Sequence, residues 1–388
     1  MGYTGRRRRR SNTRRRRMGV RERQIQLMRR IIVTVLALVL VLTAVLIVRA
    51  VRGKNEPEAV RTAGTQEVQD AKTPEPSPEP VQITVSAAGD CTLGTDEDFD
   101  YDTSFNAMFD SVGDPSYFLR NVKPIFEEDD LTIVNLEGPL TTSEDLQEKT
   151  FSFKGEPEYT QILTSGSVEA VNLANNHSRD YGEQGYEDTI KNVEAAGITS
   201  FGYDRTAVAD VKGVKVGLVG IYVLADGMER ETQLKENIAE VRAQGAQLVI
   251  VSFHWGSEKE NYPDETQVSL AHIAVDSGAD LVLGHHPHVL QGIEKYKGKN
   301  IVYSLANFCF GGNSNPSDKD TMIFQQTFTV TGDQVETDDV VNIIPCSISS
   351  ESGYNNYQPI PAEGDEKTRI QQRIDEYSAG LSDSAENR

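Results

Sequence analysis

The chain has 388 residues, and its 39 Lys and Arg against 59 Asp and Glu give a formal net charge of −20. Thirteen arginines and a single acid, Glu22, lie within residues 1–30, so the rest of the chain carries 26 basic and 58 acidic residues, a net of −32. This distribution argues against nucleic acid as a partner, because phosphate binding needs basic charge on the folded surface, and the three widely spaced cysteines argue against a disulfide framework or a CxxC zinc site.

Residues 31–48, IIVTVLALVLVLTAVLIV, form the most apolar stretch of the chain. Eighteen such residues are long enough to cross a hydrocarbon core of about 30 Å as a helix. The stretch runs into Arg49 and Arg52 without a small-x-small cleavage site, which favours an uncleaved membrane helix at 31–49 over a signal peptide. The arginines before it predict a cytoplasmic tail at 1–30 and an extracytoplasmic C-terminal domain, and an RNA-binding tail is the less favoured alternative.

Composition divides the remaining chain into three parts. Residues 50–80 are polar and acidic and end in TPEPSPEP, which is typical of an extended linker that cannot bury a core. Residues 81–345, about 265 in number, are enough for a large folded domain. Residues 346–388 are rich in Ser, Glu, Asn and Asp and are predicted to form a weakly ordered tail with one helix near 367–377.

Short apolar runs alternate with helical patterns inside the domain. Buried strands are predicted at 83–90, 131–138, 168–177, 214–222, 247–256, 279–288 and 300–308. Amphipathic helices are predicted at 116–128, 183–197 and 265–278. The alternation favours an α/β fold with largely parallel strands, followed by antiparallel strands at 322–330 and 340–344.

Five of these strands end in a carboxylate, an amide or an imidazole. The residues at these ends are Asp90, Glu137, Asn176, His177, His254, His286 and His288. The carboxyl ends of strands form the ligand crevice of open α/β sheets, so side chains far apart in sequence can converge there. One strand-end histidine is more often a core or loop residue, but the whole set suits one or two divalent transition ions.

The tripeptide His286-Pro287-His288 supports a shared site. Proline disfavours helix for the residue before it, so the tripeptide is predicted to be extended, with both imidazoles on one side. His285 is then expected to face solvent or to donate to a ligand residue. His272 lies on a predicted helix and is expected to be a partly exposed helix residue.

Several motifs of the domain together resemble one known family. In chain order they are GDCTLG (89–94), NLEGPLT (135–141), NLANNHSRDYGEQGYEDT (172–189), HWGSE (254–258) and GADLVLGHHPHVLQGIEKYKGKNIVYSLANFCF (278–310). This series resembles the CapA-type poly-γ-glutamate capsule biosynthesis proteins of the calcineurin-like metallophosphoesterase superfamily. The resemblance covers roughly residues 83–345 and implies a four-layer αββα sandwich with a dinuclear metal site, at the outer face of a bacterial cell membrane.

The resemblance also implies roles for individual residues. Asp90 and His288 match ligands of a first metal ion, and Glu137 stands where a bridging carboxylate is expected. The ligands implied for the second ion are Asn176, His254 and His286. His177 resembles the histidine that contacts a phosphoryl oxygen or protonates a leaving group, and Asp180 either orients it or is an exposed helix cap. The implied ions are Mn, Fe or Zn.

Two positions depart from the superfamily pattern, and three stay open. The bridging aspartate of GDxxD is replaced by Glu137, which lies in NLEG. Thr92 occupies the histidine position of GDxH, so the first ion loses a nitrogen ligand and is expected to bind weakly, only with substrate, or not at all. Cys91 and Cys309 are interpreted as buried apolar residues in preference to thiolate ligands. Trp255, the single tryptophan, either walls the crevice or covers the core.

Three functions are compatible with these features. The first is a membrane-anchored metal-binding component of capsule or poly-γ-glutamate assembly with hydrolase-type machinery, acting with components of the polymer synthase on an anionic polymer or a phosphate-containing envelope compound. The second is an extracytoplasmic metal-dependent phosphoesterase that acts on cell-envelope compounds. The third is a non-catalytic scaffold of the synthase complex. The preserved histidines favour a working metal centre, whereas Thr92 favours the scaffold.

Overall fold

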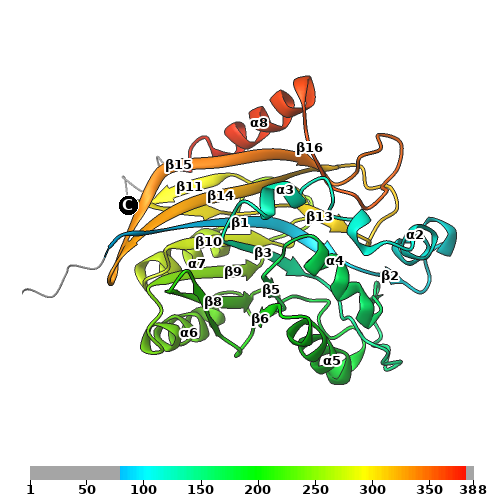
Figure 1. The fold of residues 1–388 in the computed structure, drawn as a ribbon, viewed down its shortest axis with the longest axis horizontal. Coiled ribbons are helices and arrows are strands. Elements are labelled where there is room, and N and C mark those ends of the chain that lie inside the picture. The colour runs from blue at the N-terminus through cyan, green and yellow to red at the C-terminus, as the bar shows by residue number, and fades with distance from the viewer. Residues whose placement is uncertain (1–78, 382–388) are drawn as a thin grey trace, which may run out of the picture. The chain divides into compact units, whose positions relative to one another are not determined.

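The computed structural model describes residues 79–381 (Figure 1). The predicted cytoplasmic tail, the predicted membrane helix at 31–49 and nearly all of the predicted linker lie outside this range. Between residues 79 and 381, no helix is both long and apolar enough to cross a membrane.

The larger of the two main sheets has the strand order β16-β15-β14-β1-β3-β5-β6, and β13 pairs with the end of β1. Its strands are β1 (Val81–Thr92), β3 (Leu131–Leu136), β5 (Ala170–Asn172), β6 (Thr199–Phe201), β13 (Asn307–Phe310), β14 (Asp320–Thr331), β15 (Gln334–Ser347) and β16 (Ile360–Pro361). Strands β1, β3, β5 and β6 are parallel, whereas β14 to β16 are antiparallel.

The second sheet has the order β11-β12-β10-β9-β8-β7. Its strands are β7 (Ala207–Val211), β8 (Val214–Tyr222), β9 (Leu248–His254), β10 (Leu281–His285), β11 (Ile293–Tyr296) and β12 (Lys299–Val302). Four of them, β8, β9, β10 and β12, are parallel. A small separate sheet pairs β2 (Thr95–Asp96) with β4 (Phe153–Lys154).

Three apolar clusters define the layers of the domain. The first lies between the sheets and joins residues such as Val85 and Ile133 of the larger sheet to Ile250 and Leu283 of the second. The second lies between the larger sheet and the helices α2 (Phe105–Val112), α3 (Lys123–Phe126), α4 (Thr160–Ser165) and α5 (Gly182–Ala195). The third lies between the second sheet and α6 (Glu231–Ala243) and α7 (Glu265–Asp276), which Figure 1 shows beside β8 to β10. The mixed α/β class is confirmed, with layers in the order helix, sheet, sheet, helix.

Two predicted elements are broken in the structure. The strand predicted at 300–308 divides into β12 of the second sheet and β13 of the larger sheet, because the chain turns at Ala306, which has a φ of 63°. The helix predicted at 116–128 is reduced to a short 3-10 turn and the single turn α3, since Pro124 has no N–H for an internal helix bond.

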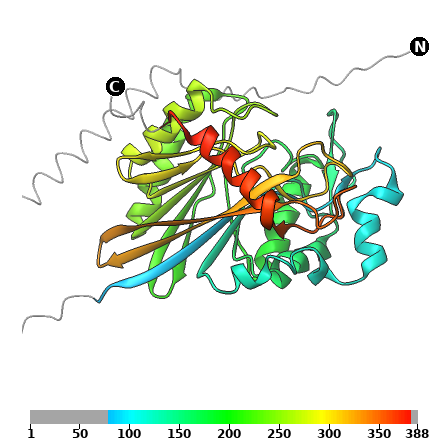
Figure 2. The same cartoon turned by 90° about the horizontal axis from the view of Figure 1, so that it is seen from above.

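The chain beyond residue 345 belongs to the fold, although its composition predicts weak order. Strand β15 extends to Ser347, and α8 (Gly364–Ser378), the red helix in Figure 2, packs against β15 and β11. This helix buries Ile370 and Ile374 in the core between the sheets, and Arg369 pairs with Asp320 at 2.6 Å. The prediction of weak order from composition is wrong here, because two buried residues one turn apart are enough to dock a helix that is otherwise polar.

Candidate metal centre

Strand ends from both sheets bring the predicted ligands together. Asp90 lies near the end of β1 and Glu137 directly follows β3, its parallel neighbour in the larger sheet. His254 ends β9, and His286 and His288 follow β10, which is parallel to β9 in the second sheet. Parallel neighbours end at the same edge, so the site lies where the carboxyl edges of the two sheets meet.

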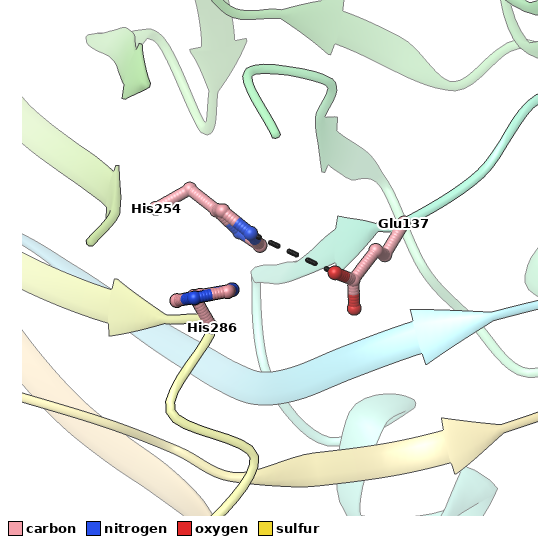
Figure 3. Close-up of side chains that lie close together, drawn as sticks. All are labelled: Glu137, His254 and His286. Carbon is pink, nitrogen blue, oxygen red and sulfur yellow. Dashed lines mark ion pairs between the residues drawn. The ribbon is translucent and has the colours of Figure 1, made fainter. Parts of the chain in front are cut away.

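The donor atoms form two groups that share one residue. Glu137, His254 and His286 make the first group, in which one ligand atom from each residue lies within 4.8 Å of the others. Asp90, Glu137 and His288 make the second group under the same limit. Figure 3 shows the Glu137 carboxylate directed at the imidazole of His254, with Oε1 and Nε2 3.6 Å apart, and His286 beside them. Glu137 is therefore the residue that the two donor groups share.

The Glu137 carboxylate is buried without a hydrogen bond. Neither of its oxygens has a partner among residues 79–381, and Nδ1 of His286 also lacks one. Burial, reinforced by the negative charge of Asp90, raises the pKa of Glu137 to about 8. Buried polar atoms are nearly always satisfied in native proteins, so these atoms call for a bound group. Oxygen and imidazole donors in this arrangement fit divalent ions such as Mn, Fe or Zn.

Asp90 is held more firmly than Glu137. Its Oδ1 accepts a hydrogen bond from Asn135 Nδ2 at 2.9 Å, and its Oδ2 accepts one from the His286 backbone N–H at 3.2 Å. His285 Nδ1 and His288 Nδ1 lie 3.4 and 3.3 Å from the carboxylate. Burial acts to raise the pKa of Asp90, but the hydrogen bonds and charges of His285 and His288 hold it well below its usual range.

His285 is a buried neighbour of the site. The expectation that it faces solvent is wrong, because its side chain is almost fully buried beside Asp90. The other expectation, that it donates to a ligand residue, fits its position, since His285 Nδ1 lies 3.4 Å from Asp90 Oδ1. The partly exposed helix position expected for His272 also agrees with the structure, where it bonds Glu294 at 3.0 Å.

Asn176 lies beside the group that contains His254. Its Oδ1 is 2.6 Å from His254 Nε2, the atom that also faces Glu137. The opposite nitrogen of His254, Nδ1, is 3.4 Å from Asn135 Nδ2. Asn135 therefore touches both Asp90 and His254, and it orients ligands in both sheets. The sequence signal for this residue is an amide in the largely apolar strand LTIVNL.

The segment His286 to His288 is bent, and the predicted extended conformation is wrong. His286 has a φ of 95° and His288 a φ of 58°, both in the left-handed region that ordinary residues rarely adopt. The two rings still lie together, with centroids 5.5 Å apart, and the His286 ring is 4.8 Å from that of His254. The bend lets both imidazoles reach carboxylates from the other sheet, which a straight strand would pass by.

The predicted catalytic pair is in contact. His177 Nδ1 lies 2.6 Å from Asp180 Oδ2, and the same oxygen accepts a hydrogen bond from the Phe153 backbone N–H at 2.8 Å. Asp180 is fully buried and the cap of α5 is Tyr181, so the alternative of an exposed helix cap is wrong. Burial lowers the pKa of His177, although Asp180 acts to raise it.

A cavity of about 660 Å³ adjoins the cluster, and His177 and His288 line it together. Its wall includes the aromatic rings of Phe99, Phe151 and Phe153, which contact one another. A pocket of this size with a few convergent polar groups is typical of a small-molecule site.

The remaining open residues lie outside the cluster. Cys91 and Cys309 are buried in the helix-side core of the larger sheet, and burial raises the pKa of the Cys91 thiol to about 12, so the apolar interpretation is favoured. Trp255 is fully buried, stacks on Phe253 at 4.2 Å and donates Nε1–H to the Tyr303 carbonyl, so it covers the core. Thr92 is buried, and its hydroxyl has no hydrogen-bond partner among the described residues.

The donor groups predict metal uptake that depends on named histidines. We expect the full-length protein to bind one or two equivalents of Mn²⁺ or Zn²⁺, and His254→Ala or His286→Ala to weaken that binding at least about tenfold, the lower bound seen even for residues that only support ligands. Equilibrium dialysis with elemental analysis measures this. His272→Ala is the matched control, because His272 bonds Glu294 outside both groups. Unchanged binding in both test variants would contradict the ligand assignment.

Metal affinity should fall as the pH is lowered from 9 to 6. Glu137, with a pKa of about 8, and His288, whose pKa is raised to about 9 by Glu137 and Asp90 against the opposing effect of burial, must both lose a proton before they bind metal. His286, with a pKa of about 4, is already neutral. Protons therefore compete with metal below pH 9. The metal affinity of the group that contains His288 should fall more steeply with decreasing pH than that of the other group. Calorimetric titration at several pH values tests this, and His288→Asn should show a shallower pH dependence of metal affinity. A metal affinity that does not change between pH 9 and pH 6 would contradict the prediction.

The solved structures that this chain is similar to have low sequence identities and low TM-scores. A hypothetical protein from Thermus thermophilus has a TM-score of 0.41 and 15% identity, covering 68% of this chain and 98% of that one. The sulfate thiohydrolase SoxB of the same species, in complex with glycerol, has a TM-score of 0.38 and 13% identity, covering 76% of this chain and 60% of that one.

Curated relatives are more similar in sequence. The capsule biosynthesis protein CapA of Bacillus anthracis is 32% identical over 220 residues, which is 50% of this chain and 54% of that protein. The PGA biosynthesis protein CapA of Bacillus subtilis (strain 168) is 33% identical over 214 residues, 49% of this chain and 55% of that protein. A probable polyglutamine synthesis accessory protein of Mycobacterium tuberculosis is 30% identical over 209 residues, 46% of this chain and 55% of that protein. The chain spans about half the length of these relatives.

The model of one protein family matches most of the domain. It is described as bacterial capsule synthesis protein PGA_cap and matches residues 84–312, more than half of the chain. This range contains both donor groups and the pair His177 and Asp180. The chain therefore belongs to the family of the bacterial capsule synthesis protein PGA_cap.

Proposed function

We propose that this protein is a membrane-anchored component of bacterial capsule or poly-γ-glutamate biosynthesis that carries a metal-dependent hydrolase site. The observation that carries the enzymatic part is the Glu137 carboxylate, which is buried without a hydrogen bond and is shared by two groups of donor atoms. The family membership and the names of the two Bacillus relatives support the biosynthetic setting. The anchor and the orientation rest on the sequence at 1–49.

In this proposal, one ion would be held by Asp90, Glu137 and His288. A second would be held by Glu137 together with Asn176, His254 and His286. Divalent ions bound there would lower the pKa of a bound water and neutralise charge that develops on a phosphoryl or carbonyl oxygen. The chain's own contribution is to fix these donors at the meeting edge of two sheets, where the residues next to them are buried.

His177 is the proposed general acid. Asp180 holds its Nδ1 atom, so Nε2 is the atom left to give a proton to a leaving group in the adjoining cavity. The Asp180 carboxylate keeps the ring in one orientation and stabilises its protonated form, as a buried carboxylate does for a catalytic histidine in other hydrolases.

The proposed substrate is an anionic polymer end or a phosphate-containing envelope compound. Outside the N-terminal tail the chain carries a net charge of −32, so an anionic polymer is repelled by most of the surface. Contact is then confined to the metal centre and to nearby cations such as Lys259 in the cavity wall. The polymer synthase components are the proposed partners, through the membrane they share.

His177→Ala tests whether the site performs chemistry. We expect activity to fall by about 10²–10⁴-fold, because general acid catalysis contributes that much, while metal content and the unfolding temperature stay near wild type. In a strain that lacks the native protein, the variant should reach the membrane in normal amounts and fail to restore surface polymer. Full restoration by His177→Ala, and also by Asp90→Asn, would favour the scaffold function.

The orientation of the protein is tested on intact protoplasts. Added protease should remove the C-terminal domain and leave a small N-terminal fragment with the membrane, because the arginines of residues 1–30 hold that end in the cytoplasm. Immunoblots with antibodies to each end provide the measurement, and protoplasts lysed before digestion provide the control. A domain that is protected until lysis would contradict the orientation.

A further inference from the structure

An irregular segment at residues 142–152 borders the catalytic pair. It connects the turn after β3 to β4 and has no helix or strand of its own. Hydrogen bonds hold it to its neighbours: among them, Gln147 N–H donates to the Asp180 carbonyl at 2.9 Å, and Ser152 N–H donates to the Asp96 side chain, Oδ2, at 2.6 Å. The segment therefore has a fixed path past the site.

Lys149 is the single cation of this segment, and it reaches into the site. Its Nζ donates to the backbone carbonyl of Asn176 at 2.6 Å and also to Asp180 Oδ1. One ammonium group thus contacts the residue proposed as a metal ligand and the residue that holds the proposed acid. About two thirds of the Lys149 side chain is buried, so water does not fully screen this contact.

The partners of Asp180 show what Lys149 contributes. One carboxylate oxygen, Oδ2, accepts from the Phe153 N–H and faces His177 Nδ1, and the other, Oδ1, accepts from Lys149. Among the described residues, Lys149 is the cation that forms an ion pair with this fully buried carboxylate. Removing one partner of a buried ion pair leaves an uncompensated charge, which favours rotation or protonation of the carboxylate that remains.

We propose that Lys149 is a positioning residue for the reaction: by fixing Asp180 Oδ1 and the Asn176 carbonyl, it holds His177 with Nε2 toward the cavity. This inference rests on the proposed hydrolase function. If Lys149 only held the segment in place, its loss would loosen residues 142–152 and lower the rate of hydrolysis equally for every substrate.

The test compares two esters that differ in their need for an acid. Nitrophenolate leaves without being protonated, whereas an alkoxide needs a proton in the transition state. With Mn²⁺-loaded full-length protein, we expect Lys149→Met to lower kcat on glycerol phosphate by about 10–100-fold and on p-nitrophenyl phosphate by less than about threefold. KM and metal content should stay unchanged, and Lys149→Arg should recover most of the loss, because it restores the charge.

Lys212→Met is the matched control. Lys212 also pairs with a largely buried carboxylate, Asp130, at 2.7 Å, but the pair lies at the opposite ends of β1 and β3 from the cluster. This variant should leave both rates unchanged. Equal losses on both esters in Lys149→Met, or none on either, would overturn the positioning role.

A second measurement separates this proposal from the hydrolase function. Crystal structures of the metal-free wild type and of Lys149→Met report the contact between His177 Nδ1 and Asp180 Oδ2 without any turnover. Loss of the contact in the variant supports positioning, and a retained contact overturns it. If the wild type binds metal, keeps the contact and hydrolyses neither ester, the hydrolase function fails while the effect of Lys149 on His177 still stands.

Discussion

The buried carboxylate of Glu137 is the constraint around which the site is arranged. A charged carboxylate buried without a hydrogen bond costs several kcal/mol unless a cation compensates it. The nearest groups that could do so are imidazoles of His254, His286 and His288, and all three take part in donor groups with it. Burial keeps the rings of His254 and His286 neutral, so neither of them can balance the charge of Glu137. His288, whose pKa is raised to about 9, balances that charge while it is protonated, and a bound cation would take over this role once His288 has lost its proton.

Convergence on Glu137 requires the two sheets to meet closely, and two glycines make that approach possible. A side chain at Gly89 would place its Cβ 1.9 Å from the Ala306 carbonyl, and one at Gly284 would lie 2.0 Å from the Tyr303 carbonyl. The segment between β12 and β13 runs through this narrow gap and bonds both sheets, through Asp90 N–H to the Ala306 carbonyl and Leu305 N–H to the Gly284 carbonyl. The same backbone that joins the sheets therefore fixes Asp90 beside the residues that follow β10.

The sequence predicted those features of the fold and the site that depend on short stretches of neighbouring residues. Buried parallel strands are continuous apolar runs, so β1, β8 and β9 could be found, and polar residues such as Asp90 and His254 at their ends indicated the site. Features set by distant contacts could not be found in this way. The split of 300–308 between two sheets, the bend at His286 and the docking of α8 each depend on partners far away in the chain. Lys149 was missed for the same reason, since it lies among exposed residues and only the fold brings it to Asp180.

The charge of the protein determines where an anionic polymer could bind in the proposed reaction. The cavity wall contains Asp98, Asp100 and Glu258, and a chain of free carboxylates laid along it would meet like charges. Positive charge would be concentrated at a metal-loaded centre and, in the cavity wall, at Lys259. An anionic polymer can then approach favourably only by placing one end, or one phosphate group, at the centre while the rest stays in solvent. Such a site would act on ends in preference to internal bonds, and it would release the product polymer readily, because the surrounding surface repels it.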